Sequence, residues 1–351
     1  MSQLNVVTVG PLATADADGV SLSQTAAAAQ YLVVNGALAA GTFDADSICA
    51  SQTPTGAGAL TINGALATTN PVAGAGGTAA AGSATVRFAT PTRIYITAAG
   101  DESGRTFTVV GTVQSPTSFG PGAVVSETIT GPNANTVASD NLYSTIISVS
   151  VDAATAGALT VGHSGTATMD KARRVSIASG GDDTSITFTL TGTDWNNDPI
   201  SEVVTGVSGA AASSVLSYKT VTSVKTSAAA ASTLIVGTNT TADSPPVYFD
   251  RLAANAQVAI QVDGVSTPTW TVQQTLNDPT VITNQLPTPT YQWSPSSIKW
   301  VNHPDTALVG STVISGVQGT YAAAPVMSRV SMTTSSTTAA VTAQFVQAYM
   351  S

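Results

Sequence analysis

The amino-acid sequence predicts an all-β protein with repeated units, and three observations support this prediction. Val, Ile and Thr are abundant and alternate with other residues in short runs, which is the period of a strand with one buried face. Turn-forming Gly, Asn and Asp residues separate these runs at intervals of about 8–12 residues, as in β-sandwich domains. Two stretches of the chain also occur twice, so we expect duplicated modules.

The longer repeat begins with a predicted hairpin. Residues 93–112 align without a gap with residues 174–193, an offset of 81, and both copies place a Gly- and Asp-containing turn between two alternating runs. Further along, the offset is 75, for example between Glu127 and Glu202. The first copy therefore has six extra residues before Glu127, and their Pro and Gly content predicts a surface loop. The predicted domains are two duplicated Ig-like β-sandwich modules, at 84–166 and 167–242.

A shorter repeat, of 28 residues, occupies the N-terminal part of the chain. Both copies begin with Asp-Ala-Asp, at Asp16 and at Asp44, and both contain a strand that ends in an Asn-Gly turn. A unit this small cannot bury its own apolar face. We therefore expect residues 1–70 to form an extended N-terminal β arm that lies on neighbouring units, on the rest of the chain or on another subunit. A Gly/Ala-rich linker, 71–83, follows the arm.

Residues 247–351 are predicted to form a third, C-terminal β domain, because alternating strands continue there and three of the four tryptophans fall in this range. A Pro-rich stretch within it contains aromatic residues. Tyr291, Trp293 and Trp300 would form a partner surface or a platform on which glycans stack. Core or subunit interface is the commoner use of such a cluster.

Charge and composition exclude several classes of partner. The net charge of −9 disfavours nucleic acid and anionic membranes, because neither attracts an acidic surface. No apolar run reaches the length that spans a membrane. The first residues have neither a basic nor an apolar region typical of a secretory signal peptide, so we expect synthesis in a cytoplasm. A single cysteine, Cys49, leaves no disulfide within the chain.

The sequence does not predict an enzyme or a bound cofactor. Its two histidines, His163 and His303, lie at predicted turns, and no nucleophile elbow, phosphate-binding loop, dinucleotide fingerprint or Cys-x-x-Cys is present.

Paired acidic residues at the two hairpin turns are weak calcium candidates, because Ca²⁺ binds loop carboxylates. The commoner explanation is that Asp stabilises turns through hydrogen bonds with its own backbone, and we favour it over a metal site. The candidates are Asp101, Glu102, Asp182 and Asp183.

Three stretches resemble sequences that recur in structural proteins of tailed-bacteriophage virions. They are the arm motif ASQTPTGAGALTING (50–64), the hairpin ARRVSIASGGDDTSITFTLTGT (172–193) and the ending GTYAAAPVMSRVS (319–331). The resemblance implies a capsid decoration (cement) protein or a head or tail fibre-like component located in the virion. Its implied partners are the major capsid protein or other virion proteins, and further copies of the same chain as a homo-oligomer, with a trimer as one possibility.

The leading functional hypothesis is a non-enzymatic decoration protein that stabilises the head lattice through its N-terminal arm and projects its β domains outward. The alternative is a tail or fibre protein that binds host-surface glycans through the aromatic C-terminal domain. A bacterial surface adhesin is a third hypothesis, which the lack of a recognisable signal peptide disfavours.

Overall fold

The structure is a computed structural model, and it describes residues 2–13, 15–16, 20–24, 26, 30–32, 34, 44–68, 84–113, 122–250, 257–277, 298–334 and 336–348. Within these ranges the regular structure is strand, apart from one 3₁₀ turn, η2 (Thr306–Leu308). The strands form four antiparallel sheets, which confirms the all-β prediction. The described residues contain no helix of the length and apolarity that would cross a membrane.

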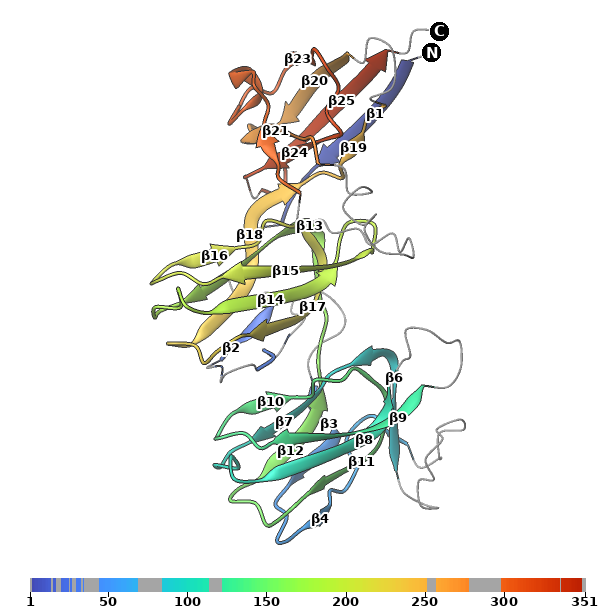
Figure 1. Cartoon of the computed structure of the whole chain (residues 1–351), viewed down its shortest axis with the longest axis vertical. Coiled ribbons are helices and arrows are strands. Elements are labelled where there is room, and N and C mark those ends of the chain that lie inside the picture. Colours follow the sequence, from blue (N-terminus) through green and yellow to red (C-terminus); the bar gives the residue numbers. More distant parts are fainter. Residues whose placement is uncertain are drawn as a thin grey trace.

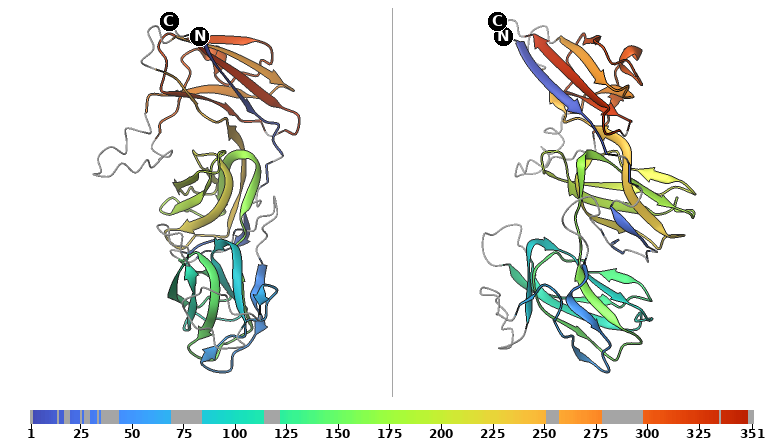
Figure 2. Two further views of the ribbon diagram at one scale, coloured as in Figure 1. Left: turned by 90° about the vertical axis from the view of Figure 1, so that its right-hand side faces the viewer. Right: turned by 180° about the vertical axis from the view of Figure 1, so that it is seen from behind.

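Figure 1 shows three β units stacked along the long axis of the molecule. We call them the terminal unit, which holds both chain ends, the middle unit, and the distal unit at the opposite end (Figures 1 and 2). Each unit has its own cluster of buried apolar side chains, represented by Phe345 in the terminal unit, Phe188 in the middle unit and Phe107 in the distal unit.

The distal unit consists of two sheets that share one core. The order of the first sheet is β10 (Thr136–Ala138), β7 (Ile94–Ala98), β12 (Leu159–His163), β3 (Asp44–Gln52). The order of the second is β5 (Ala67–Thr68), β6 (Thr85–Thr92), β11 (Tyr143–Val151), β8 (Thr106–Val113), β9 (Ala123–Thr130), with β4 (Gly58–Ala59) also paired to β11. Buried residues of both sheets, such as Ile96 and Val109, belong to the same cluster.

A single eleven-stranded sheet connects the middle and terminal units. Its order is β15 (Pro199–Thr205), β14 (Thr187–Thr193), β17 (Tyr218–Thr226), β13 (Ala167–Ser179), β18 (Leu234–Asp243), β24 (Met327–Met332), β21 (Trp270–Thr275), β22 (Val301–Asn302). Three short strands pair beside this path: β16 (Ala211–Ser213) with β13, β19 (Val247–Tyr248) with β24, and β2 (Ser21–Gln24) with β18. Strand β18 passes from one unit to the next, since its last residues Ala242 and Asp243 pair with β24.

The terminal unit is completed by a four-stranded sheet that contains both ends of the chain. Its order is β1 (Ser2–Val9), β25 (Ala340–Ala348), β20 (Val258–Val265), β23 (Val317–Tyr321). Phe345 of this sheet and Trp270 of β21 belong to one buried cluster, so the sheet packs against the terminal part of the eleven-stranded sheet.

The N-terminal segment contributes strands to all three units. β1 pairs with β25 in the terminal unit, β2 with β18 in the middle unit and β3 with β12 in the distal unit. The chain thus passes through the three units in one direction and returns through them in the other, and both ends lie at the same tip (Figures 1 and 2). The sequence left three partners open for residues 1–70. The described strands of this segment pair with the rest of the same chain. The predicted linker, 71–83, lies outside the described residues.

Residues that correspond through the sequence repeats make the same strand pairings. In the distal unit Leu159 lies opposite Gln52, and in the middle unit Leu234 lies opposite Gln24. These four residues correspond at the offsets of 75 and 28 found in the sequence. The next pairing along each strand follows the same rule, so each 28-residue repeat meets one long repeat in one register.

Candidate functional site

The arrangement closest to a catalytic one lies in the distal unit, around His163. Its Nδ1 is 2.7 Å from the hydroxyl of Ser47, and its strand partner is Asp44. Burial lowers the pKa of His163, an effect that the negative charge of Asp44 partly opposes. A serine nucleophile must reach its substrate, but Ser47 is fully buried and its hydroxyl also donates to the Asp44 carbonyl oxygen. The group therefore joins β3 to β12, the pairing that holds the N-terminal segment on this unit.

The second histidine, His303, lies in the terminal unit and is buried against Tyr321, with 4.6 Å between ring centroids. Its Nδ1 accepts a hydrogen bond of 3.0 Å from the backbone N–H of Asp305. Burial lowers the pKa of His303, which favours the neutral ring that accepts this bond. The ring therefore fixes the turn that leads into η2.

Asp101 and Asp182, the first acidic residue of each hairpin turn, bond to the turn itself. Oδ1 of Asp101 accepts from the N–H of Ser103 at 2.9 Å and from its hydroxyl at 2.6 Å. Oδ1 of Asp182 accepts the same two bonds from Thr184, at 3.1 and 2.8 Å. The hydroxyl bonds, followed by the backbone bonds, lower the pKa of both carboxyl groups. These are the turn hydrogen bonds that the sequence favoured over calcium.

Glu102 and Asp183, the second acidic residue of each turn, are almost fully buried. One oxygen of each accepts from a loop backbone: from Gly157 N–H at 3.0 Å, and from Ala231 N–H at 2.8 Å. The other oxygen has no hydrogen-bond partner. Across the described ranges no three His, Cys, Asp or Glu side chains come together as a metal site. Calcium binding at these four residues stays an untested alternative to the turn hydrogen bonds.

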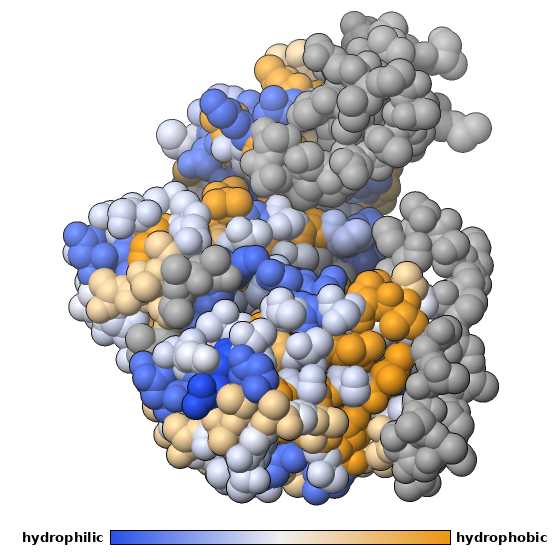
Figure 3. Space-filling model, turned by 60° about the horizontal axis from the view of Figure 1, so that its bottom comes forward, coloured by the Kyte–Doolittle hydropathy of each residue, from blue (hydrophilic) through white to orange (hydrophobic). Residues whose placement is uncertain are grey.

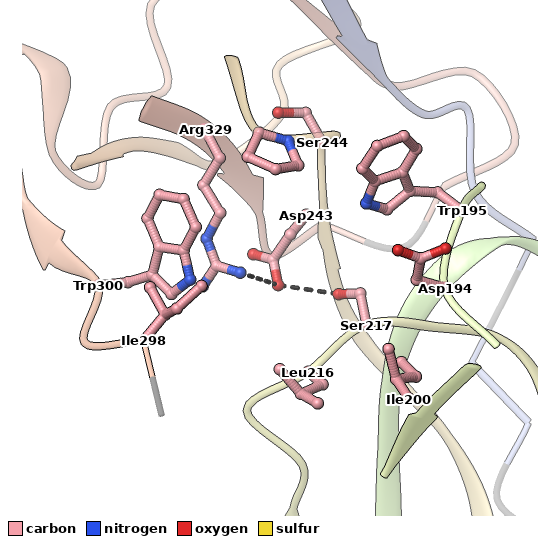
Figure 4. Close-up of a pocket in the computed structure, with 11 residues that line it drawn as sticks. Asp194, Trp195, Ile200, Leu216, Ser217, Asp243, Ser244, Ile298, Trp300 and Arg329 are labelled. Atoms are coloured by element: carbon pink, nitrogen blue, oxygen red, sulfur yellow. Dashed lines mark hydrogen bonds and ion pairs between the residues drawn. The ribbon is translucent and has the colours of Figure 1, made fainter. Parts of the chain in front are cut away.

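Of the three aromatic candidates, the structure describes Trp300 alone; Tyr291 and Trp293 lie outside the described residues. Trp300 lines a small cavity between the middle and terminal units, opposite Trp195 (Figure 4). The sequence analysis did not single out Trp195, which lies in the turn between β14 and β15. The ring of Trp300 is covered by the guanidinium of Arg329, whose Cζ lies 4.3 Å from the ring centroid.

Asp243 lies at the centre of this junction and holds both units (Figure 4). Its Oδ2 is 3.3 Å from Nε of Arg174 in the middle unit and 3.2 Å from Nη1 of Arg329 in the terminal unit, and it accepts from the hydroxyl of Ser217 at 2.8 Å. Burial alone would raise the pKa of Asp243, but the two guanidinium charges and the serine hydroxyls outweigh burial and lower it. Burial lowers the pKa of Arg329 to about 10, with the Asp243 charge opposing.

The cavity at this junction is small, about 50 Å³, which is room for a few water molecules. Asp243 and Arg329 of its lining already pair with one another, and Asp194 accepts from the backbone N–H groups of Asn196 and Asp198 at 2.7 and 3.0 Å. The junction therefore has the chemistry of a buried clamp rather than of a substrate site.

The N-terminal segment reinforces this junction. Leu12 N–H donates to the Ser336 carbonyl of the terminal unit at 2.8 Å, while the neighbouring Ala13 N–H donates to Asp170 of the middle unit at 2.7 Å. The buried Arg173 returns a bond of 2.8 Å to the Ala13 carbonyl. These two residues of the N-terminal segment therefore bind both units.

The same segment fills the junction between the middle and distal units. The ring of Tyr31 lies between two cations, with Arg93 of the distal unit 3.5 Å and Lys225 of the middle unit 4.6 Å from its centroid. The adjacent Leu32 donates from its N–H to the Val224 carbonyl at 2.8 Å and accepts from the Tyr95 hydroxyl at 2.7 Å. Both junctions are thus bridged by the N-terminal segment as well as by the returning chain.

Figure 3 shows the surface of the distal unit, on which apolar side chains gather on one side and polar side chains on the other.

Comparisons of the chain with protein-family models, with curated proteins and with solved structures give no match. The functional assignment therefore depends on the residues and contacts described above.

Proposed function

We propose that the protein is a non-enzymatic structural protein of a tailed-phage virion, most simply a capsid decoration protein that projects from the particle as a stiff column. The main support is the N-terminal segment, which crosses both junctions between units and bonds to each side. Two chain passages at each junction oppose bending more strongly than the single linker of ordinary tandem domains. Such a column suits a decoration protein that holds its outer unit at a fixed distance from the particle.

We further propose that the distal and middle units are duplicated Ig-like modules, each completed by one 28-residue repeat. The support is the shared register of Leu159 with Gln52 and of Leu234 with Gln24. A second support is the carboxylate that closes an equivalent loop in each unit: Glu127 accepts from the N–H of Asn141 at 3.2 Å, and Glu202 accepts from the N–H of Leu216 at 2.9 Å.

The attachment surface in this proposal differs from the one expected from sequence. The N-terminal arm was expected to bind the capsid lattice, but its described strands are paired within the chain. We therefore propose that the terminal unit, which contains both chain ends, attaches to the major capsid protein or a neighbouring virion protein, and that the distal unit points outward.

Quantitative mass spectrometry of purified virions tests this role. A decoration protein is expected at a copy number comparable to that of the major capsid protein. A handful of copies per particle would instead favour a tail or fibre component. Recovery of the chain only in the soluble fraction of infected cells, and never in virions, would contradict the virion proposal altogether.

Binding of host glycans, the alternative function, has one observation in its favour: Trp195 and Trp300 face the same cavity. Two tryptophans around polar groups are typical of sugar-binding sites. Here, however, Arg329 already covers Trp300, and Asp243 is saturated by its own partners. Binding of the purified chain to a glycan array, abolished by Trp300→Ala, would favour this alternative over decoration.

A further inference from the structure

Strand β1 differs from every other long edge strand among the described residues. Four edge strands have seven residues or more: β1, β3, β9 and β15. An edge strand exposes unpaired N–H and C=O groups, and proteins protect such edges with charges, prolines or bulges that block pairing with another chain. The four edges can therefore be compared by the protection that each carries.

The other three each contain a charged residue or a proline. β3 contains Asp44 and Asp46, and its pairing with β12 is interrupted by two shifts of register. β9 contains Glu127, whose carboxylate accepts from the N–H of Asn141. β15 begins with Pro199, which has no N–H to offer; its Glu202 is buried against a loop.

β1 has none of these features. Its sequence, SQLNVVTV, is uncharged and lacks proline, and it pairs with β25 over eight consecutive residues without a shift. In the part of the chain that the structure describes, no strand pairs with its other edge. β1 is therefore a regular, unblocked edge of the kind that accepts a further strand.

The outer face beside this edge is also nearly free of charge. The four strands of the sheet contain one charged residue, Asp263, whose carboxylate accepts from the Gln261 amide at 3.0 Å and from the Gly316 N–H at 2.8 Å. Leu4 and Val6 of β1 are 56% and 54% exposed on this face. The same sheet has a groove of about 360 Å³ lined by residues of β25, β20 and β23.

We propose that β1 pairs antiparallel with β1 of a second copy of this chain, which would join the two four-stranded sheets into one of eight strands. Each copy carries a net charge of −9, so two copies repel over most contacts, while this edge brings no charge to the contact. Antiparallel pairing also places Leu4 and Val6 of one copy on the same face as the equivalent residues of the other, where apolar cross-strand pairs stabilise the sheet.

The proposed contact is isologous, so it closes with two copies and gives a dimer rather than the trimer considered from the sequence. It is independent of the virion proposal, because a monomeric chain could still decorate a particle. A dimer would double the number of terminal units that one assembly presents to its attachment surface.

The test is the mass of the full-length chain in solution, measured by light scattering over a dilution series. We expect a dimer that dissociates on dilution. Val6→Lys should weaken it by about tenfold or more, because lysines of the two copies would come close together across the new pair. The matched control is Val203→Lys, at a valine 61% exposed on the protected edge strand β15, which should leave the dimer unchanged.

Cysteine cross-linking tests the same contact without placing a charge on β1. With Leu4 of one copy opposite Val6 of the other, the double variant Leu4→Cys with Val6→Cys should form a disulfide-linked dimer under mild oxidation, whereas Val203→Cys should not. The native Cys49 is buried and does not compete. A wild-type chain that stays monomeric at high concentration would overturn the proposal. So would a dimer that Val6→Lys and Val203→Lys weaken equally, or loss of particle attachment in Val6→Lys without any wild-type dimer, which would assign the edge to a strand of another protein.

Discussion

Replacing Asp243 with alanine should destabilise the junction between the middle and terminal units by about 3–5 kcal/mol. The carboxylate is the shared partner of Arg174 and Arg329. The Arg329 side chain is only 7% exposed and the Arg174 side chain 22%, so the substitution leaves one guanidinium buried without a counter-charge and the other poorly hydrated. Removing one member of a buried ion pair costs far more than the pair contributes, because the remaining charge stays desolvated.

The measurement is urea denaturation followed by tryptophan fluorescence, since Trp195 and Trp300 line the same cavity and report on this junction. The control is Asp140→Ala, which breaks the ion pair with Lys225 at the other junction. The Asp140 side chain is 73% exposed, so this change should cost about 1 kcal/mol or less. The double variant Asp243→Leu with Arg329→Met should recover much of the loss, because apolar replacement of a buried pair is often neutral.

Equal effects of the two alanine substitutions would refute this reasoning, since they would show that Asp243 is as well hydrated as a surface carboxylate. A fluorescence transition of Asp243→Ala with the same urea midpoint as the wild-type chain would also refute it.

Four further outcomes follow from the structure. The lowered pKa of Asp243 means that its contribution is complete above the unfolded value of about 3.9 and is lost as the pH falls through the folded value, so acid unfolding of Asp243→Asn should be less steep in that range. Gly111→Ala and Gly192→Ala should each cost about 1–3 kcal/mol in thermal melts, because the new Cβ would lie 2.1 and 1.9 Å from a carbonyl oxygen of the adjacent strand, while Gly104→Ala, which meets nothing within 4 Å, should cost little. Deletion of residues 1–70 should lower the melting temperature of all three units and reduce β-sheet circular dichroism, because each unit loses a paired strand. Addition of a calcium chelator should leave the melting temperature unchanged if the acidic turn residues serve only their own backbone; a clear drop would favour calcium binding at these turns.

The sequence was informative where the fold depends on local pattern. Alternation of β-branched residues predicted strands, and the repeat offsets of 75 and 28 identified corresponding residues, which the structure shows in equivalent pairs, Leu159 with Gln52 and Leu234 with Gln24. Local pattern could not say which strand each part of the arm would meet, because strand pairing is decided by complementary faces far apart in the chain. Thr8 and Thr342, which share a hydrogen bond of 3.0 Å, lie 334 positions apart.

The junction residues were missed for a related reason. Arg174, Asp243 and Arg329 come from three separate strands, and none stands in a motif that marks it as a partner of the others. Trp195 gave a faint signal, because it is the one tryptophan outside the C-terminal region. The turn that contains it follows Thr193, and in the sequence the six-residue insertion of the first copy follows the corresponding Thr112.

The path of the chain also sets the order in which the protein can be completed on the ribosome. The distal unit has all its described strands once β12 has emerged, and the middle unit once β18 has emerged, but β1 must wait for β25, which follows both in the chain. Until β25 emerges, β1 lacks its partner strand, so nascent chains on neighbouring ribosomes would be most prone to associate through β1.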